Sequence, residues 1–169
     1  MQPRNLERAS SELVKVCHLA YERGYICGTE GNFSLRLDER TLLTTPAGTC
    51  KGLLSPSDLV LTNLDGIALD SPQNQGKKPS TELKMHLVVY QQRADVMAVA
   101  HAHPTTAVAF TVAGKSLNRC VLPEAILTLG KIAVAPYATP STDEVPESII
   151  EHLQHTDTIL LSHHGALTF

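Results

Sequence analysis

The sequence has no tryptophan, and aromatic residues make up only 4% of its 169 residues. Such a chain offers few rings on which nucleotide bases or sugars could stack, so an aromatic binding platform is not expected. It also lacks any run of lysine or arginine, and its formal net charge is −3. This charge gives no electrostatic reason to bind nucleic acid or a membrane surface, and we expect neither partner.

Long hydrophobic runs and paired cysteines are missing as well. No apolar stretch approaches the about 20 residues that a membrane-spanning helix needs, and the first residues lack the apolar core of a signal peptide. The cysteines are scattered, with no CxxC pair, at Cys17, Cys27, Cys50 and Cys120. These features favour free thiols in a reducing compartment, so we expect a cytoplasmic protein.

The length and the apolar content, 43% of residues, suit one domain with a substantial core. Apolar residues at helical spacing and short alternating runs between turn residues mark the expected elements. Helices are expected at 6–24, 81–90, 105–114 and 145–155, and strands at 33–37, 41–45, 59–63, 67–70, 95–103, 132–137 and 158–165. Early antiparallel strand pairs with helices interspersed predict a single α/β (α+β-like) domain over residues 1–169. Its central sheet is expected to be mainly antiparallel, with helices on both faces.

Two histidines, His101 and His103, end an apolar run and are followed by Pro104. On a strand, residues i and i+2 point to the same face with Cα atoms about 6.6 Å apart. Both imidazoles could therefore bind one cation. Two core histidines with satisfied hydrogen bonds explain this pair equally well when it is considered alone.

A second pair, His163 and His164, also follows a run typical of a buried strand and precedes Gly165. Adjacent residues of a strand point to opposite faces, so only one of these two can join His101 and His103. Three histidines with an open fourth position are typical of catalytic zinc. The residues alone predict such a site and leave open which histidine completes it.

Glu82 is a candidate for proton transfer. It follows Ser80, the expected N-cap of the helix at 81–90, where a carboxylate could simply compensate the helix dipole. The alternative is a carboxylate that moves a proton at the mouth of the metal site. Ser80, Thr81 and the free N–H groups of a helix start would then lie beside it and could bind an anion.

Two glycine-containing loops offer further donors. Residues 28–34 contain Thr29 and Asn32 between two glycines, and a weaker loop at 44–48 contains Thr45 and Gly48. Either loop alone is most simply a connector between a helix or strand and the next strand. Together with the Ser80–Thr81 segment and a metal site, they favour a substrate that carries phosphate or a comparable anion.

Five motifs, in this order and spacing, resemble those of the class II aldolase/adducin family. They are GTEGNFS at 28–34, TPAG at 45–48, PSTE at 79–82, HAH at 101–103 and HHG at 163–165. The resemblance covers essentially the whole chain from about Leu6 onward, and within the family it is strongest to fuculose-1-phosphate aldolase. Epimerases of the family have aspartate where this chain has Glu82, which favours the aldolase branch.

The resemblance implies a site and an activity. One Zn2+ per chain, or another divalent metal, would be held by His101, His103 and His164. Glu82 would be the catalytic carboxylate in aldol cleavage or condensation of a small sugar phosphate through a metal-stabilised enediolate. The resemblance also implies a homotetramer. The expected substrate- and phosphate-binding positions are Thr29, Asn32, Thr45, Gly48, Ser80 and Thr81.

Two features depart from the family pattern. The stretch at 120–126 lacks the tyrosine of the aldolases and offers Glu124 instead, and the chain ends at Phe169, before the family's C-terminal helices. Alternative activities are an epimerase, a dehydratase or a decarboxylase on the same metal site. A non-catalytic scaffold like the adducin head domain is a further alternative, but such a domain needs none of the three histidines.

Overall fold

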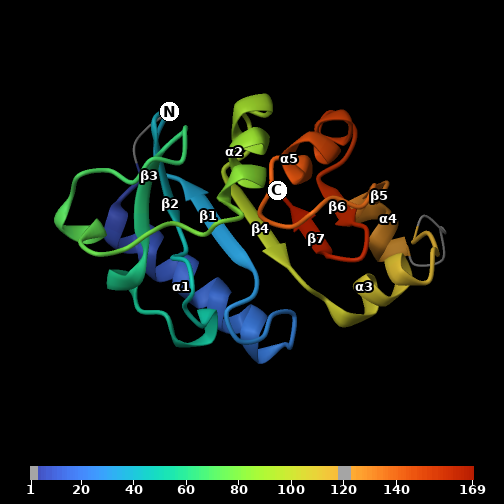
Figure 1. The fold of residues 1–169 in the computed structure, drawn as a ribbon, viewed down its shortest axis with the longest axis horizontal. Helices are drawn as coiled ribbons and strands as arrows, with labels where there is room; N and C mark the ends of the chain where they lie inside the picture. Colours follow the sequence, from blue (N-terminus) through green and yellow to red (C-terminus); the bar gives the residue numbers. More distant parts are fainter. Residues whose placement is uncertain (1–3, 118–122) are drawn as a thin grey trace.

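The computed structural model describes residues 4–117 and 123–169. Its centre is a seven-stranded sheet that runs across the molecule in the order β3-β2-β1-β4-β7-β6-β5 (Figure 1). Neighbouring strands are antiparallel, except that β5 runs parallel to β6. The strands are β1 (Asn32–Arg36), β2 (Thr41–Thr44), β3 (Val60–Asn63), β4 (Ala98–Ala102), β5 (Ala133–Ala135), β6 (Thr158–Leu161) and β7 (Gly165–Thr168). The predicted α/β fold with a mainly antiparallel sheet is confirmed.

Helices cover both faces of this sheet. They are α1 (Leu6–Glu22), α2 (Leu83–Gln92), α3 (Thr105–Val112), α4 (Pro123–Leu129) and α5 (Glu144–Ile149). One core cluster joins α1 to the sheet, and the other joins α2 and α5 to it. Leu42 belongs to the second cluster and its neighbour Leu43 to the first. Because successive strand residues point to opposite faces, the two clusters lie on opposite sides of the sheet.

The first helix forms where the sequence predicts it. Asn5 caps α1, since its side chain accepts a hydrogen bond from the backbone N–H of Arg8 at 2.9 Å. The helix ends before Gly24, whose φ of +69° suits glycine and stops the helical path. Its buried stripe, spaced three and four residues apart, packs on the sheet.

The start of α2 differs from the prediction. The helix begins at Leu83, so Ser80 is not its N-cap. Residues 79–80 pair with the loop after β2 instead, because Pro46 and Pro79 form a bridge and the backbone N–H of Ser80 donates to the Thr45 carbonyl at 3.2 Å. This pairing delays the helix, although Ser80 Oγ still accepts from the backbone N–H of Glu82 at 3.3 Å.

Three other boundaries also differ. Residues 67–70 do not form the expected strand and touch β3 through a single bridge between Thr62 and Ala68. The helix expected at 145–155 is divided into α5 and a 3-10 turn at Ile150–His152. The strand expected at 158–165 ends at Leu161, and a turn then leads into β7.

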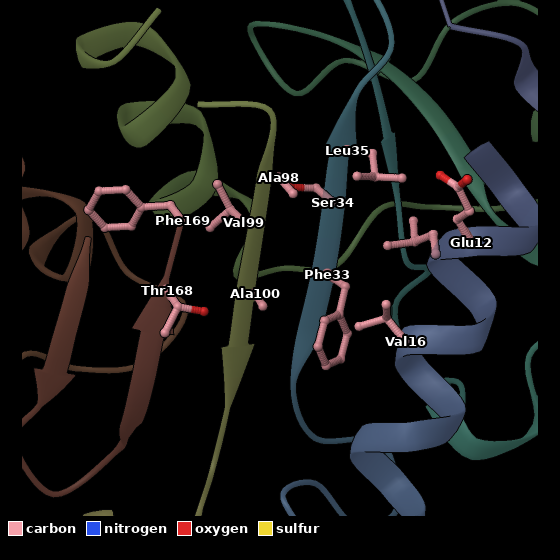
Figure 2. A pocket seen from close by; sticks show the side chains of 11 residues that line it. Glu12, Val16, Phe33, Ser34, Leu35, Ala98, Val99, Ala100, Thr168 and Phe169 are labelled. Atoms are coloured by element: carbon pink, nitrogen blue, oxygen red, sulfur yellow. The ribbon is translucent and has the colours of Figure 1, made fainter. Parts of the chain in front are cut away.

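An apolar cleft of about 390 Å³ lies between α1 and strands β1, β4 and β7 (Figure 2). Val16, Phe33 and Leu35 face one another across its α1 side, and Ala98 and Phe169 line the other. None of the predicted site residues contributes to this cleft. The candidate chemistry therefore lies elsewhere.

The structure bears on two further expectations, one about membrane-spanning helices and one about free cysteines. In residues 4–117 and 123–169, no helix is long and apolar enough to cross a membrane. Cys17, Cys27 and Cys50 are free thiols, as predicted. Cys120 lies outside the described residues.

Candidate metal centre

Strand β4 supplies two of the predicted metal-binding histidines. His101 lies within β4, paired with Asn32 of β1 and Leu167 of β7, and His103 follows one residue after the strand. Their rings lie on the same side, as the strand period predicts, with the two Nε2 atoms 3.0 Å apart. The backbone N–H of His103 donates to the Tyr25 carbonyl at 2.8 Å, which fixes the chain where the ladder ends.

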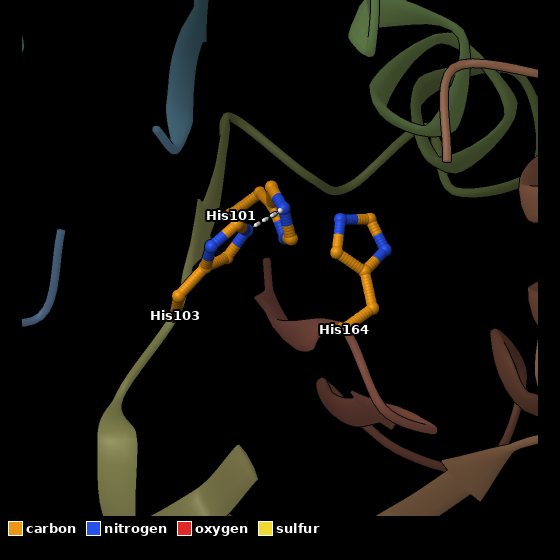
Figure 3. Close-up of side chains that lie close together, drawn as sticks. All are labelled: His101, His103 and His164. Atoms are coloured by element: carbon orange, nitrogen blue, oxygen red, sulfur yellow. Dashed lines mark hydrogen bonds between the residues drawn. The ribbon is translucent and has the colours of Figure 1, made fainter. Parts of the chain in front are cut away.

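His164 completes the cluster from the turn between β6 and β7. Figure 3 shows its ring facing those of His101 and His103, and one possible ligand nitrogen from each ring lies within 4.8 Å of the others. His163 adopts a φ of +57° in this turn, and its ring lies near that of Tyr137, with centroids 6.2 Å apart. The turn, rather than alternation along a strand, therefore selects His164.

Burial favours the neutral, metal-binding form of two of the histidines, His101 and His103. Burial lowers the pKa of His101 to about 3, against the opposing effect of Glu82, and burial also lowers the pKa of His103. His101 Nδ1 lies 3.0 Å from the Ala166 carbonyl. Nδ1 must therefore carry the proton that it donates, which leaves a lone pair on Nε2 facing the other rings. Together with the ring of His164, these imidazoles are a donor set that could bind a divalent metal.

Glu82 lies directly against the cluster. Its Oε1 is 3.1 Å from His164 Nε2, and its Oε2 is 3.5 Å from His101 Nε2. Asn32 Nδ2 donates to the same Oε2 at 3.1 Å, so strand β1 orients the carboxylate. Burial acts to raise the pKa of Glu82, but the bond from His164 and the neighbouring imidazoles outweigh it and hold that pKa at about 2. The carboxylate is therefore ionised, and not in the near-neutral range that suits a proton-transfer group best.

A pocket of about 370 Å³ opens beside Glu82, His103 and His164. The bridge between residues 46 and 79 sets two predicted loops side by side in its wall, and the backbone N–H of Ala47 donates to the Lys78 carbonyl at 2.9 Å. Four residues predicted to bind phosphate line this pocket, namely Thr29, Gly48, Ser80 and Thr81.

The other two predicted phosphate-binding residues lie behind the pocket wall. Asn32 is buried and bound to Glu82, and Thr45 is fully buried, with its hydroxyl accepting from the backbone N–H of Phe33 at 3.2 Å. In this arrangement both support the wall from inside. Their role in binding a substrate stays a prediction.

Three residues near the centre were not found from the sequence. Glu30 Oε2 lies 3.6 Å from His103 Nδ1 and accepts from the Cys27 thiol at 3.1 Å. Lys51 lines the pocket although its motif ends at Gly48. A Cβ on Gly165 would lie 2.6 Å from the Ala102 carbonyl, so β7 can approach β4 only with glycine there. Glu30 and Gly165 lie inside recognised motifs, which was the only signal for them.

Comparison with known proteins identifies a family and several relatives. The family model for the Class II Aldolase and Adducin N-terminal domain matches residues 11–169. An L-fuculose phosphate aldolase of Methanococcus maripaludis is 35% identical over 158 residues, which cover 94% of this chain and 82% of that protein. A 3-oxo-tetronate 4-phosphate decarboxylase of Pectobacterium atrosepticum is 32% identical over 163 residues, covering 94% of this chain and 72% of the relative.

The fold is likewise similar to that of a solved structure. The L-fuculose-1-phosphate aldolase of Thermus thermophilus superposes with a TM-score of 0.81 at 30% sequence identity. The superposition covers 96% of this chain and 78% of that protein.

Proposed function

Because the chain belongs to the class II aldolase and adducin N-terminal domain family, we propose that it is a zinc-dependent lyase acting on a small sugar phosphate. The reaction proposed is aldol cleavage, or condensation in reverse, of the fuculose-1-phosphate type. The observation that carries this proposal is the convergence of three imidazoles on one point with an ionised carboxylate beside them. A scaffold domain has no need of that arrangement.

The residues divide the chemistry between them. His101, His103 and His164 would hold the metal, which when bound supplies a Lewis acid that polarises the substrate's carbonyl. In condensation Glu82 would take the proton from the carbon that becomes nucleophilic, and in cleavage it would deliver a proton to that same carbon after the C–C bond breaks. Asn32 keeps one carboxylate oxygen of Glu82 in place through its amide N–H.

The neighbouring pocket would hold the substrate's phosphate. Thr29, Ser80 and Thr81 offer hydroxyl donors, and the loop at Gly48, with a φ of +67°, can present backbone N–H groups. Asn32 and Thr45 complete the proposed set from behind the wall. Binding the phosphate here would place the reacting carbons near Glu82, His103 and His164, which line the same pocket.

Metal analysis tests the proposed centre. We expect about one divalent ion per purified chain, with zinc preferred, and no ion in the His101→Ala/His103→Ala double variant. His155→Ala removes an exposed histidine remote from the cluster and should keep the metal. A wild-type protein that binds no metal, with zinc supplied, would contradict the proposal.

Substrate profiling tests the reaction. The protein is incubated with fuculose-, rhamnulose- and ribulose-type phosphates, and dihydroxyacetone phosphate or glycolaldehyde phosphate is followed. Release of one of these from one sugar supports an aldolase. Interconversion of sugars without cleavage would indicate an epimerase instead.

A decarboxylase is the second candidate, because one relative with that name is 32% identical over nearly the whole chain. The same histidines and Glu82 could serve it, since loss of carbon dioxide from a 3-oxo acid also leaves negative charge beside the carbonyl. Carbon dioxide released from 3-oxo-tetronate 4-phosphate, without cleavage of any ketose phosphate, would favour this activity.

We also propose, from the family resemblance, that the domain at 1–169 assembles into a homotetramer. Light scattering on the eluting protein measures the mass directly. A monomeric mass at micromolar concentration would contradict this assembly.

A further inference from the structure

Lys51 is a buried cation in the wall of the proposed substrate pocket. It is the first residue of a 3-10 turn (Lys51–Leu53) that follows the loop at Gly48. The residue is only 2% exposed, yet it lines the pocket together with Thr29, Ser80 and Thr81. Its Nζ donates to the Thr29 carbonyl at 2.6 Å.

Within the part of the chain that the structure describes, this ammonium has no counter-charge of its own. Among the described residues, Thr29 supplies its one hydrogen-bond acceptor, and no carboxylate lies within ion-pair distance of it. An ammonium has three N–H donors, so two remain without an acceptor among these described residues. Burial lowers the pKa of Lys51, with weaker opposing effects from Cys17, Cys50 and Glu82, which reflects the cost of keeping that charge out of water.

Apart from the histidines, the other side chains that line the pocket carry either no charge or a negative one, so the positive charge of Lys51 matters for binding an anion. The hydroxyls of Thr29, Ser80 and Thr81 are neutral, and two carboxylates, Glu30 and Glu82, also line the cavity. An incoming anion would be repelled by both carboxylates. Among the described residues that line the pocket, Lys51 is the only lysine or arginine, and its charge can offset this repulsion.

We propose that the Lys51 ammonium binds the anionic group of the substrate, a phosphate dianion or a comparable anion. Its bond to Thr29 places the charge beside the hydroxyl donors, and its two free N–H groups supply the charge-assisted bonds that those hydroxyls lack. The inference rests on the proposed function, since it assigns one more residue to the same pocket.

Binding of inorganic phosphate tests this role without turnover. Calorimetry and thermal unfolding are followed during titration with phosphate, on protein as purified and after dialysis against EDTA. Three variants are compared with the wild type. Lys51→Gln keeps an N–H donor toward the Thr29 carbonyl but removes the charge, Lys51→Met removes both, and Lys15→Met removes an exposed lysine of α1 as a control.

We expect phosphate to bind and stabilise the wild type and Lys15→Met alike. Both Lys51 variants should fold in phosphate-free buffer, because they lose a buried charge without a counter-ion, and should bind phosphate at least about tenfold more weakly. Equal affinity in Lys51→Gln and wild type, or no phosphate binding by the wild type, would overturn the proposal. Failure of both variants to fold without phosphate would also overturn it, since the ammonium would then serve the fold.

The result can be separated from the fate of the proposed reaction. Phosphate binding that depends on Lys51 in a protein without aldolase or decarboxylase activity would refute the reaction and support this inference. An active enzyme whose KM for the sugar phosphate is unchanged in Lys51→Gln would support the proposed reaction and refute the role of Lys51.

Discussion

Glu82 connects the parts of the candidate site at the level of single residues. It touches His101 and His164, accepts a hydrogen bond from Asn32, and faces the pocket with 15% of its side chain exposed. Its carboxylate is ionised because the imidazoles outweigh the effect of burial on its pKa. A carboxylate with so low a pKa is a weak base, and it readily releases a proton that it has accepted.

Glu82→Gln tests this assignment. Gln has the same shape and still offers an oxygen to Asn32, but it cannot accept a proton from carbon. We expect the turnover number to fall about 10²-fold or more with metal content unchanged. Glu147→Gln, on an exposed position of α5, is the control and should keep full activity. Unchanged activity in Glu82→Gln would show that another group moves the proton.

His86 is a second residue whose charge state matters, in this case for stability. It is fully buried, with Nδ1 2.7 Å from Ser34 Oγ, which in turn lies 2.9 Å from the Tyr90 hydroxyl. Burial lowers the pKa of His86 to about 3, whereas an unfolded histidine titrates near about 6.5. The unfolded chain therefore binds a proton over this range that the folded chain does not bind.

Stability should consequently fall as the pH is lowered from about 6.5. The free energy of unfolding of metal-free protein, measured with urea, should lose up to about 1.4 kcal/mol per pH unit from this residue. His86→Gln should show a shallower dependence, while His155→Gln, an exposed histidine, should follow the wild type. Identical slopes in His86→Gln and the wild type would contradict the assignment of a neutral buried imidazole.

At the level of elements, the approach of β7 to β4 builds the histidine cluster. A Cβ on Gly165 would lie 2.6 Å from the Ala102 carbonyl, 2.7 Å from His103 Cδ2 and 2.8 Å from His101 Cε1. The first of these neighbours is backbone and cannot move aside by a rotamer change. The absence of a side chain at Gly165 therefore lets the turn bring His164 against the other two rings.

Gly165→Ala should separate the strands and displace the rings. We expect a loss of about 1–3 kcal/mol in the free energy of unfolding and weaker metal binding, measured by denaturation and by competition with a chelator. Gly76→Ala is the matched control, because its φ is +73° but its Cβ would meet nothing within 4 Å. It should lose some stability through backbone strain and keep its metal affinity. Unimpaired metal binding in Gly165→Ala would contradict this account of the turn.

For the whole molecule, the sheet joins two apolar cores into one folding unit. Leu42 and Leu43 are adjacent in β2 and both fully buried, one in the cluster with α2 and α5 and the other in the cluster with α1. Because the same strand supports both cores, neither core should survive loss of the other.

Leu42→Ala and Leu43→Ala should each cost about 2–5 kcal/mol in the free energy of unfolding, in a single transition. Far-ultraviolet circular dichroism and tyrosine fluorescence, recorded during denaturation, should give the same midpoint in each variant. Leu127→Ala, at a position that is 86% exposed on α4, should change little. Separate transitions for the two probes would show that the cores fold independently.

The sequence by itself determined the features that depend on neighbours along the chain. Helical spacing placed α1, and alternation placed β1, β2 and β3 to within about two residues. The strand period put His101 and His103 on one side, and their motif order indicated the family. These are local properties, set by the repeat of the backbone and by the residues that end each element.

The tertiary structure decided what depends on segments that are distant along the chain. Residue reasoning left His163 and His164 as alternatives, and the left-handed turn before β7 turned only His164 toward the cluster. Pairing with the loop after β2 moved the start of α2 from Thr81 to Leu83. A sequence pattern cannot contain such outcomes, because they follow from strand order and turn geometry.

The charges of the site likewise depend on segments that are distant along the chain. The ionised state of Glu82 and the buried ammonium of Lys51 depend on which groups fold against them, and those groups lie far away in the sequence. The sequence could name the donors, the acceptors and the order of their motifs. Only the packed sheet, with β4 between β1 and β7, brought them to one place.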